Sequence, residues 1–109
     1  MPEVMCSRIR IKPGSLGAVR DWARTISERR DEALATLREE DVHLESVFLE
    51  HASDGDYLVY YMRATDLAAS REIGRTSKHA IDDYHHRFMK EHTELVAQLE
   101  LLVDLDLAG

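Results

Sequence analysis

The sequence has little of several features that would point to particular classes of protein. Its single cysteine, Cys6, cannot form a disulfide within the chain, and no apolar run approaches the roughly 20 residues that a membrane-spanning helix needs. Basic residues are also in deficit, because 14 Lys and Arg stand against 21 Asp and Glu and leave a formal charge of −7. Since this charge repels nucleic-acid phosphate and anionic lipid, we expect neither nucleic acid nor a membrane as a partner.

The length of 109 residues is that of one domain, so we expect residues 1–109 to form a single unit. The opening Met-Pro-Glu-Val-Met-Cys contains neither a basic start nor an apolar signal segment. Together with the lone cysteine, this opening makes the cytoplasm the expected compartment.

The clearest structural signal lies in residues 42–64. Two runs rich in Val, Phe, Leu and Tyr flank Ser53-Asp54-Gly55-Asp56, and a Gly with Asp on both sides suits a tight turn. This pattern predicts a β-hairpin with strands at residues 42–51 and 57–64.

Apolar periodicity predicts the other elements. We expect a strand at 4–11, a long helix from the N-cap Ser15 to about 40, a short helix at 67–75 capped by Asp66, a helix at about 79–97, and a last strand at 99–107. The fold class is therefore α+β: a ferredoxin-like split βαβ (β-α-β-β-α-β) with a four-stranded antiparallel sheet and both helices on one face.

The helix-free face of this sheet needs a cover. Residues 57–62 and 47–49 are apolar on both sides of their strands, whereas a strand with one wet face should alternate. We therefore expect a homodimer through this face, with an interface above roughly 1,200 Å².

Several segments carry a resemblance to a known family: Lys12-Pro13-Gly14-Ser15 and the residues of 45–50, 54–62, 81–88 and 100–105. The chain resembles a small bacterial family described only as a domain of unknown function, which is similar to the dimeric α+β barrel superfamily. That superfamily includes cofactor-free monooxygenases, haem-degrading enzymes, lactone isomerases and sugar mutarotases, so the resemblance implies a dimeric barrel but selects no reaction. The monooxygenases and haem degraders typically place an Asn in the pocket, and this sequence contains none.

Four of the six histidines fall within the predicted helix at 79–97. At about 100° per residue, His85 and His92 share a face with Phe88, whereas His79 and His86 project to the opposite side. We therefore expect His85 and His92 to be the more buried pair, and the only pair that borders a pocket. They are candidates for acid or base catalysis, or else structural histidines bonded to the backbone or to a tyrosine.

The outer side of the same helix offers a weaker metal hypothesis. His79, Asp83 and His86 have the i, i+4, i+7 spacing that could hold a divalent ion. An exposed face with three ligands and no supporting residues is a poor site, so we expect no metal and no cofactor.

Arg30 and the tyrosines complete the candidate site. Arg30 falls in the apolar stripe of the first helix, where it needs either a carboxylate partner within the fold or an anionic ligand. Tyr60, Tyr61 and Tyr84 are explained by sheet packing or by the dimer interface, or alternatively by a pocket that one phenol shares with Arg30 and a histidine.

Two hypotheses of function remain open at this point. The first is a homodimeric protein that binds a small polar or aromatic ligand between the helices and the sheet. The second is a cofactor-independent enzyme, an isomerase, mutarotase or monooxygenase, with His85 or His92 as acid or base and Arg30 as an anion clamp.

Overall fold

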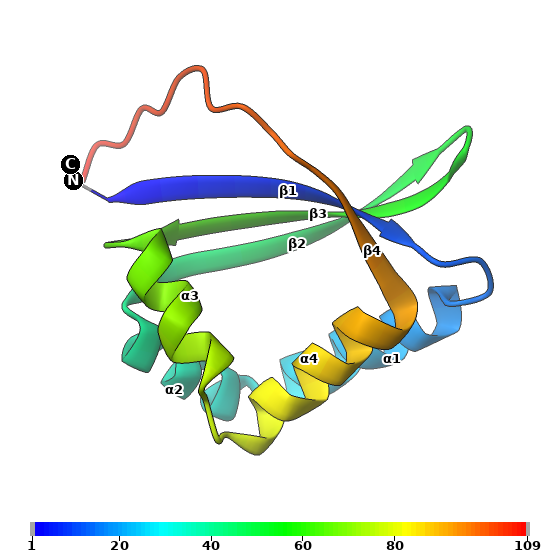
Figure 1. Cartoon of the computed structure of the whole chain (residues 1–109), viewed down its shortest axis with the longest axis horizontal. Helices are drawn as coiled ribbons and strands as arrows, with labels where there is room; N and C mark the ends of the chain where they lie inside the picture. Colours follow the sequence, from blue (N-terminus) through cyan, green and yellow to red (C-terminus); the bar gives the residue numbers. More distant parts are fainter. Residues whose placement is uncertain (1, 109) are drawn as a thin grey trace.

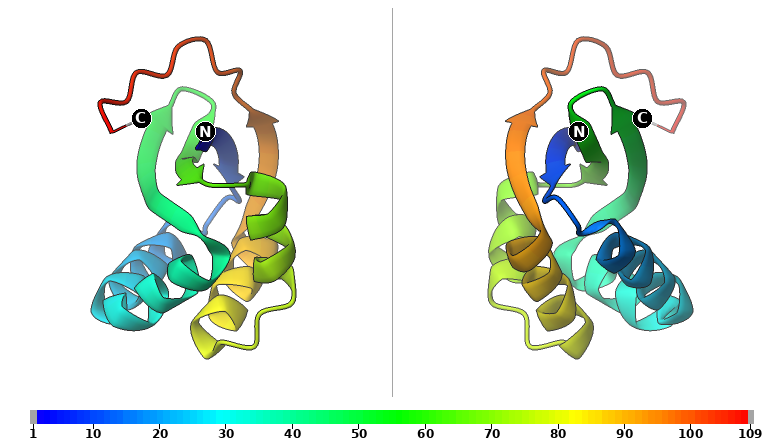
Figure 2. Two further views of the ribbon diagram at one scale, coloured as in Figure 1. Left: turned by 90° about the vertical axis from the view of Figure 1, so that its left-hand side faces the viewer. Right: turned by 90° about the vertical axis from the view of Figure 1, so that its right-hand side faces the viewer.

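The computed structural model describes residues 2–108, and its centre is a four-stranded antiparallel sheet in the order β2-β3-β1-β4. The helices of this part of the chain all cover one face of the sheet, with α1 and α2 on one side and α3 and α4 on the other (Figures 1 and 2). The predicted α+β class and antiparallel sheet are confirmed. In chain order, the elements are β1 (Glu3–Ile11), α1 (Leu16–Glu28), α2 (Arg30–Glu40), β2 (Val42–Ala52), β3 (Gly55–Ala64), α3 (Leu67–Arg75), α4 (Ala80–His92) and β4 (Thr93–Gln98).

The predicted hairpin is confirmed as β2 and β3. Ala52 pairs with Gly55, so the turn itself consists of Ser53 and Asp54. Gly55 has φ +144°, a conformation that other residues rarely adopt, and this requirement explains why glycine ends the turn. The resulting register directs alternate residues of β3, including Leu58 and Tyr60, toward the helices.

The predicted helix from 15 to 40 is one element in the sequence pattern and two in the structure. The chain bends at Arg29, which has φ −99° and ψ 38° and separates α1 from α2. The four residues around the bend, Ser27-Glu28-Arg29-Arg30, are polar, so no apolar side chain holds this turn against the sheet. The predicted cap is also wrong in detail, because the Ser15 hydroxyl bonds His92 Nδ1 at 3.0 Å instead of capping α1.

The second half of the chain divides differently from its prediction. The short helix α3 is confirmed, with the Asp66 carboxylate accepting from Ala69 N–H at 3.1 Å. The next helix, however, ends at His92, and the last strand is Thr93–Gln98 instead of 99–107. Pairing with β1 overrides the helical pattern here, because Thr93 faces Ile11 in the ladder and is buried.

The core lies between the sheet and the helices, mainly at the α1–α4 end. Trp22 of α1 stacks on Phe88 of α4, with ring centroids 4.8 Å apart and planes inclined by 8°. Both rings pack on the buried sheet residues Ile9 and Leu58. Trp22 is therefore a packing residue of the core.

The helix-free face of the sheet is partly covered by charged side chains. Arg8 places its guanidinium 3.5 Å from the centre of the Tyr57 ring and donates to Glu50 at 3.0 Å, so Tyr57 is buried beneath it. Phe48, on the same face, remains 62% exposed. Residues 99–107 follow β4 as an extended segment that lies on this side of the sheet (Figure 1).

Candidate functional site

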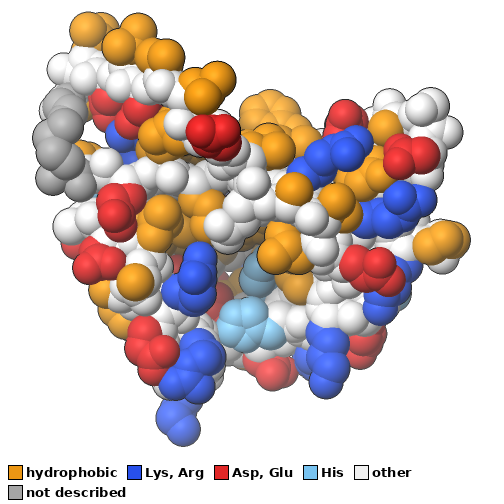
Figure 3. Space-filling view, turned by 45° about the horizontal axis from the view of Figure 1, so that its top comes forward, with side chains coloured by type: hydrophobic (Ala, Val, Ile, Leu, Met, Phe, Trp, Pro, Cys, Tyr) orange, Lys and Arg blue, Asp and Glu red, His pale blue; other side chains and the backbone are white. Residues whose placement is uncertain are grey.

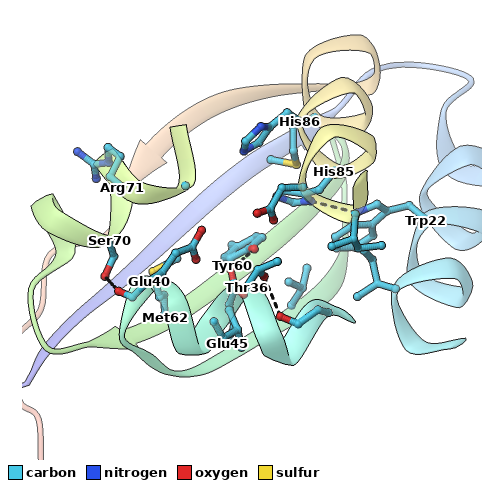
Figure 4. A pocket seen from close by; sticks show the side chains of 18 of the residues that line it. Trp22, Thr36, Glu40, Glu45, Tyr60, Met62, Ser70, Arg71, His85 and His86 are labelled. Atoms are coloured by element: carbon cyan, nitrogen blue, oxygen red, sulfur yellow. Dashed lines mark hydrogen bonds between the residues drawn. The ribbon is translucent and has the colours of Figure 1, made fainter. Parts of the chain in front are cut away.

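A cleft of about 830 Å³ separates the helices from the sheet. Its walls come from all of the helices in residues 2–108 and from β1, β2 and β3, and about half of the side chains that line it are apolar. Figure 3 shows a hollow with histidine beside it, and Figure 4 shows polar side chains converging on the space. A cleft of this size with a few convergent polar groups has the form of a small-molecule site.

His85 reaches the cleft from α4, and its protonation is fixed by Trp22. The indole Nε1–H donates to His85 Nδ1 at 3.1 Å. Because an indole nitrogen can only donate, Nδ1 must be unprotonated, and the imidazole proton sits on Nε2. Burial, assisted by the neighbouring His86, lowers the pKa of His85 to about 4. At neutral pH, His85 is thus an uncharged hydrogen-bond donor.

Tyr60 and Glu45 form a second polar pair on the floor of the cleft. They project from the paired strands β3 and β2, and the Tyr60 hydroxyl donates to Glu45 Oε1. Burial raises the pKa of Glu45, against the opposing effect of this hydrogen bond. Burial and the nearby Glu45 carboxyl raise the pKa of Tyr60 well above its ordinary value. Tyr60 is therefore a neutral phenol at any physiological pH.

Glu40, the last residue of α2, supplies the group that titrates nearest to neutral pH. Burial raises its pKa to about 7, and the carboxylates of Asp82, Glu45 and Glu39 add to the effect. Within residues 2–108, no hydrogen bond to this carboxyl group is found. Space beside it is limited on the α3 side, because a Cβ at Gly74 would lie 2.7 Å from Glu40 Oε1. Glu40 therefore exchanges a proton in the pH range of the cell.

Three of the residues expected at the site line the cleft, namely His85, Tyr60 and Arg30. Arg30 is exposed at the start of α2, because the bend at Arg29 takes it out of the stripe that the continuous helix would have formed.

The other three lie elsewhere. His92 bonds Ser15 at the far end of α4, Tyr84 packs against the core, and Tyr61 contacts Arg63 on the helix-free face. His86 is exposed and nevertheless lines the cleft, so the expectation that only His85 and His92 border a pocket is wrong. Both residues 85 and 86 of α4 border the cleft, because the cleft opens beside the helix and not directly beneath it.

Glu40 and Glu45 were missed by reasoning from the sequence. Glu45 shares the inward side of β2 with Val47 and Leu49, so a lone carboxylate on an apolar strand face was the available signal. Glu40 carried no comparable signal, because it ends a helix whose last turn is charged on most sides.

The fold and this cleft define a small α+β protein with a ligand-sized hollow between its sheet and its helices. By sequence, the chain belongs to a family of unknown function, DUF6176, whose model matches residues 2–108. The predicted membership of a domain family of unknown function is thereby confirmed. A search of curated proteins found none that matches the chain.

Two further observations concern metals and membranes. Within residues 2–108, no three His, Cys, Asp or Glu side chains are grouped so that they could hold a metal ion; His79 instead bonds Glu39 at 2.8 Å. None of the helices in the same range is long and apolar enough to cross a bilayer.

Proposed function

We propose that this chain forms a cytoplasmic homodimer that binds a small polar or aromatic molecule in the cleft between its helices and its sheet. The observation that carries the proposal is the cleft of about 830 Å³, whose apolar walls hold a few inward-facing polar groups. The polar groups favour a polar ligand. His85 offers an uncharged donor, Glu40 and Glu45 offer carboxyl groups, and the guanidinium groups of Arg30, Arg71 and Arg75 also line the cleft.

A thermal-shift screen with phenol, hydroxybenzamides and small cyclic ketones tests ligand binding. At least one such compound is expected to raise the midpoint of unfolding of the wild-type protein. Ala33→Phe, which fills the cleft from α2, should abolish this rise, whereas Ala68→Phe on the exposed side of α3 should preserve it. A rise that survives Ala33→Phe would place the ligand elsewhere and contradict the proposal.

A second candidate function is cofactor-independent proton transfer, which one combination of residues favours. Glu40, with a pKa of about 7, lines the same cleft as the neutral donor His85. In this version, Glu40 takes a proton from the carbon beside a carbonyl group, and His85 Nε2–H donates to the carbonyl oxygen. For a hydroxyketone, Glu40 returns the proton to the former carbonyl carbon while the substrate's own hydroxyl proton passes to the former carbonyl oxygen, and the two transfers complete an isomerisation. Glu40 thus replaces the histidines as the acid and base.

Hydrogen–deuterium exchange at the α-carbon of small hydroxyketones, followed by NMR, tests this candidate. Glu40→Gln is expected to slow enzyme-dependent exchange by about 100-fold or more. Glu28→Gln, a matched change at an exposed position of α1, should leave the rate unaltered. Wild-type exchange no faster than that of Glu40→Gln would remove the enzymatic candidate and leave ligand binding in place.

Glu40 also makes a prediction about stability. Its raised pKa means that the folded state binds the proton more tightly, so its stabilisation is complete below about pH 4.5 and is lost as the pH rises through about 7. The full difference corresponds to about 3 kcal/mol, which partial exposure reduces to about 1 kcal/mol. Urea unfolding should find Glu40→Gln about 1 kcal/mol more stable than wild type at pH 8 and no more stable at pH 4. An equal difference at both pH values would contradict the assignment.

The proposed homodimer forms through the helix-free face of the sheet. Phe48 on this face is 62% exposed, and Leu44 lies on the same strand with 43% exposed. An interface between two such faces is expected to bury more than roughly 1,200 Å². Light scattering at micromolar concentration should give twice the mass of the chain, and a monomer would contradict the assembly.

A further inference from the structure

Residues 99–107, here called the C-terminal arm, leave the sheet after β4 and remain extended without strand partners. The arm starts from the sheet, because Leu99 N–H donates to the Cys6 carbonyl of β1 at 2.8 Å. It then runs on the side of the sheet opposite to the helices (Figures 1 and 2).

Along the arm, acidic side chains are partly buried and apolar side chains are exposed, which is the opposite of the arrangement that water favours. Asp104 and Asp106 turn toward the sheet and pair with Arg63 at 2.7 and 3.0 Å, and their side chains are 30% and 27% exposed. Leu102 and Leu105, in contrast, are 82% and 90% exposed. The ion pairs thus hold the arm on its own sheet with its apolar side chains outward, where they gather at the upper left of Figure 3.

Six large apolar side chains in nine residues form a surface that a solvated arm would not maintain. They are Leu99, Leu101, Leu102, Val103, Leu105 and Leu107, and every one is about half exposed or more. Phe48 on β2 is a further exposed apolar side chain on the helix-free face of the sheet. A membrane is disfavoured as the cover, because the arm alternates these residues with acidic ones and the whole chain carries a charge of −7.

We propose that the C-terminal arm is the contact layer between two copies of this chain, and that its outward apolar side chains pack on the arm and the exposed Phe48 of the partner copy. The inference deepens the proposed homodimer and rests on it. A second copy fits because a two-fold axis brings the same surface from both sides: each arm covers the other, and Arg63 satisfies the acidic residues of each arm within its own subunit.

Sedimentation equilibrium of two variants tests the arm. One is the chain ended after Gln98, and the other is the full-length double variant Val103→Ser/Leu105→Ser, which keeps the arm and its acidic residues. Each is expected to raise the dimer dissociation constant by at least 100-fold, because the apolar surface that drives association is removed. Glu100→Gln, a matched change at an exposed acidic position of the arm, should leave the dissociation constant within about 3-fold of wild type.

The outcomes separate the arm from the dimer itself. A wild-type dimer that both variants leave equally tight overturns the role of the arm and retains the homodimer. A monomeric wild type overturns both proposals, and so does a wild type that associates only with lipid vesicles. Circular dichroism and urea unfolding establish that each variant is folded; if the shortened chain is not, the double variant decides.

Discussion

Replacing Trp22 with alanine is expected to lower the free energy of unfolding by about 4 kcal/mol. The indole is 6% exposed, stacks on Phe88 and belongs to the buried cluster that joins α1 and α4 to the sheet. Its removal takes away buried apolar surface and leaves a cavity that neighbouring helices cannot fill by small shifts. Urea unfolding followed by circular dichroism measures the change.

Trp22→Phe serves as the control, because it keeps an aromatic ring against Phe88 while it removes the N–H donor to His85 and part of the buried ring volume. We expect this variant to lose about 1 to 2 kcal/mol, from the missing hydrogen bond and the smaller ring. The NMR signals of His85 should then report a mixture of tautomers in place of a single Nε2–H form. A loss below about 1 kcal/mol for Trp22→Ala would show that the stacked pair carries little of the core.

Acid is expected to destabilise the protein through His85. Because burial lowers its pKa from 6.5 to about 4, the folded state resists protonation: the stabilisation is complete above about pH 6.5 and is lost as the pH falls toward 4. A difference of this size corresponds to about 3 kcal/mol, of which we expect about 2 kcal/mol since one edge of the ring meets the cleft. Urea unfolding at pH values between 7 and 4 follows the loss.

The comparison with variants isolates this residue from Glu40, whose contribution changes in the opposite direction over part of the same range. His85→Gln can still accept from Trp22 and does not titrate, so its stability should fall by about 2 kcal/mol less than that of wild type between pH 7 and 4. Lys90→Gln, at an exposed position of α4 outside the cleft, is the control and should follow the wild-type curve. Parallel curves for wild type and His85→Gln would contradict the assignment.

The sequence predicted the parts of this fold that local chemistry determines. Gly55 marked the hairpin because the turn needs its positive φ, and Asp66 marked α3 because its carboxylate caps the first turn. The bend at Arg29 was missed because the apolar stripe of the predicted helix continues beyond it, and the start of β4 at Thr93 was missed because it follows from pairing with a distant strand. Thr93 leaves the helix in order to pair with Ile11, 82 residues earlier, and periodicity carries no information about such a partner.

The residues of the candidate site were likewise predictable only where a local sequence pattern determines their position. Helical periodicity placed His85 at the helix–sheet boundary, and His85 lines the cleft. The strand pattern left open which face of the sheet Tyr60 occupies, and Tyr60 also lines the cleft. Glu40 became a titrating group only through burial and through carboxylates from other elements. The alternation of apolar and acidic residues predicted a last strand at 99–107, and this prediction is wrong, because β4 ends at Gln98. Alternation shows which residues share one side of an extended chain, but it does not show which strand they pair with.

The bond from Trp22 to His85 has a consequence for how the cleft would choose among closely related molecules. With the proton held on Nε2, the ring offers a donor and never an acceptor to whatever occupies the cleft. Two forms of one compound that differ only in the position of a hydrogen, such as a ketone and its enol, would form different hydrogen bonds with His85. The ketone oxygen can accept this proton with both of its lone pairs free, whereas a hydroxyl that points its hydrogen at Nε2–H meets a second donor. Under the proposed ligand-binding function, a packing residue 63 positions away in the chain would thereby bias the cleft toward the keto form of such a ligand.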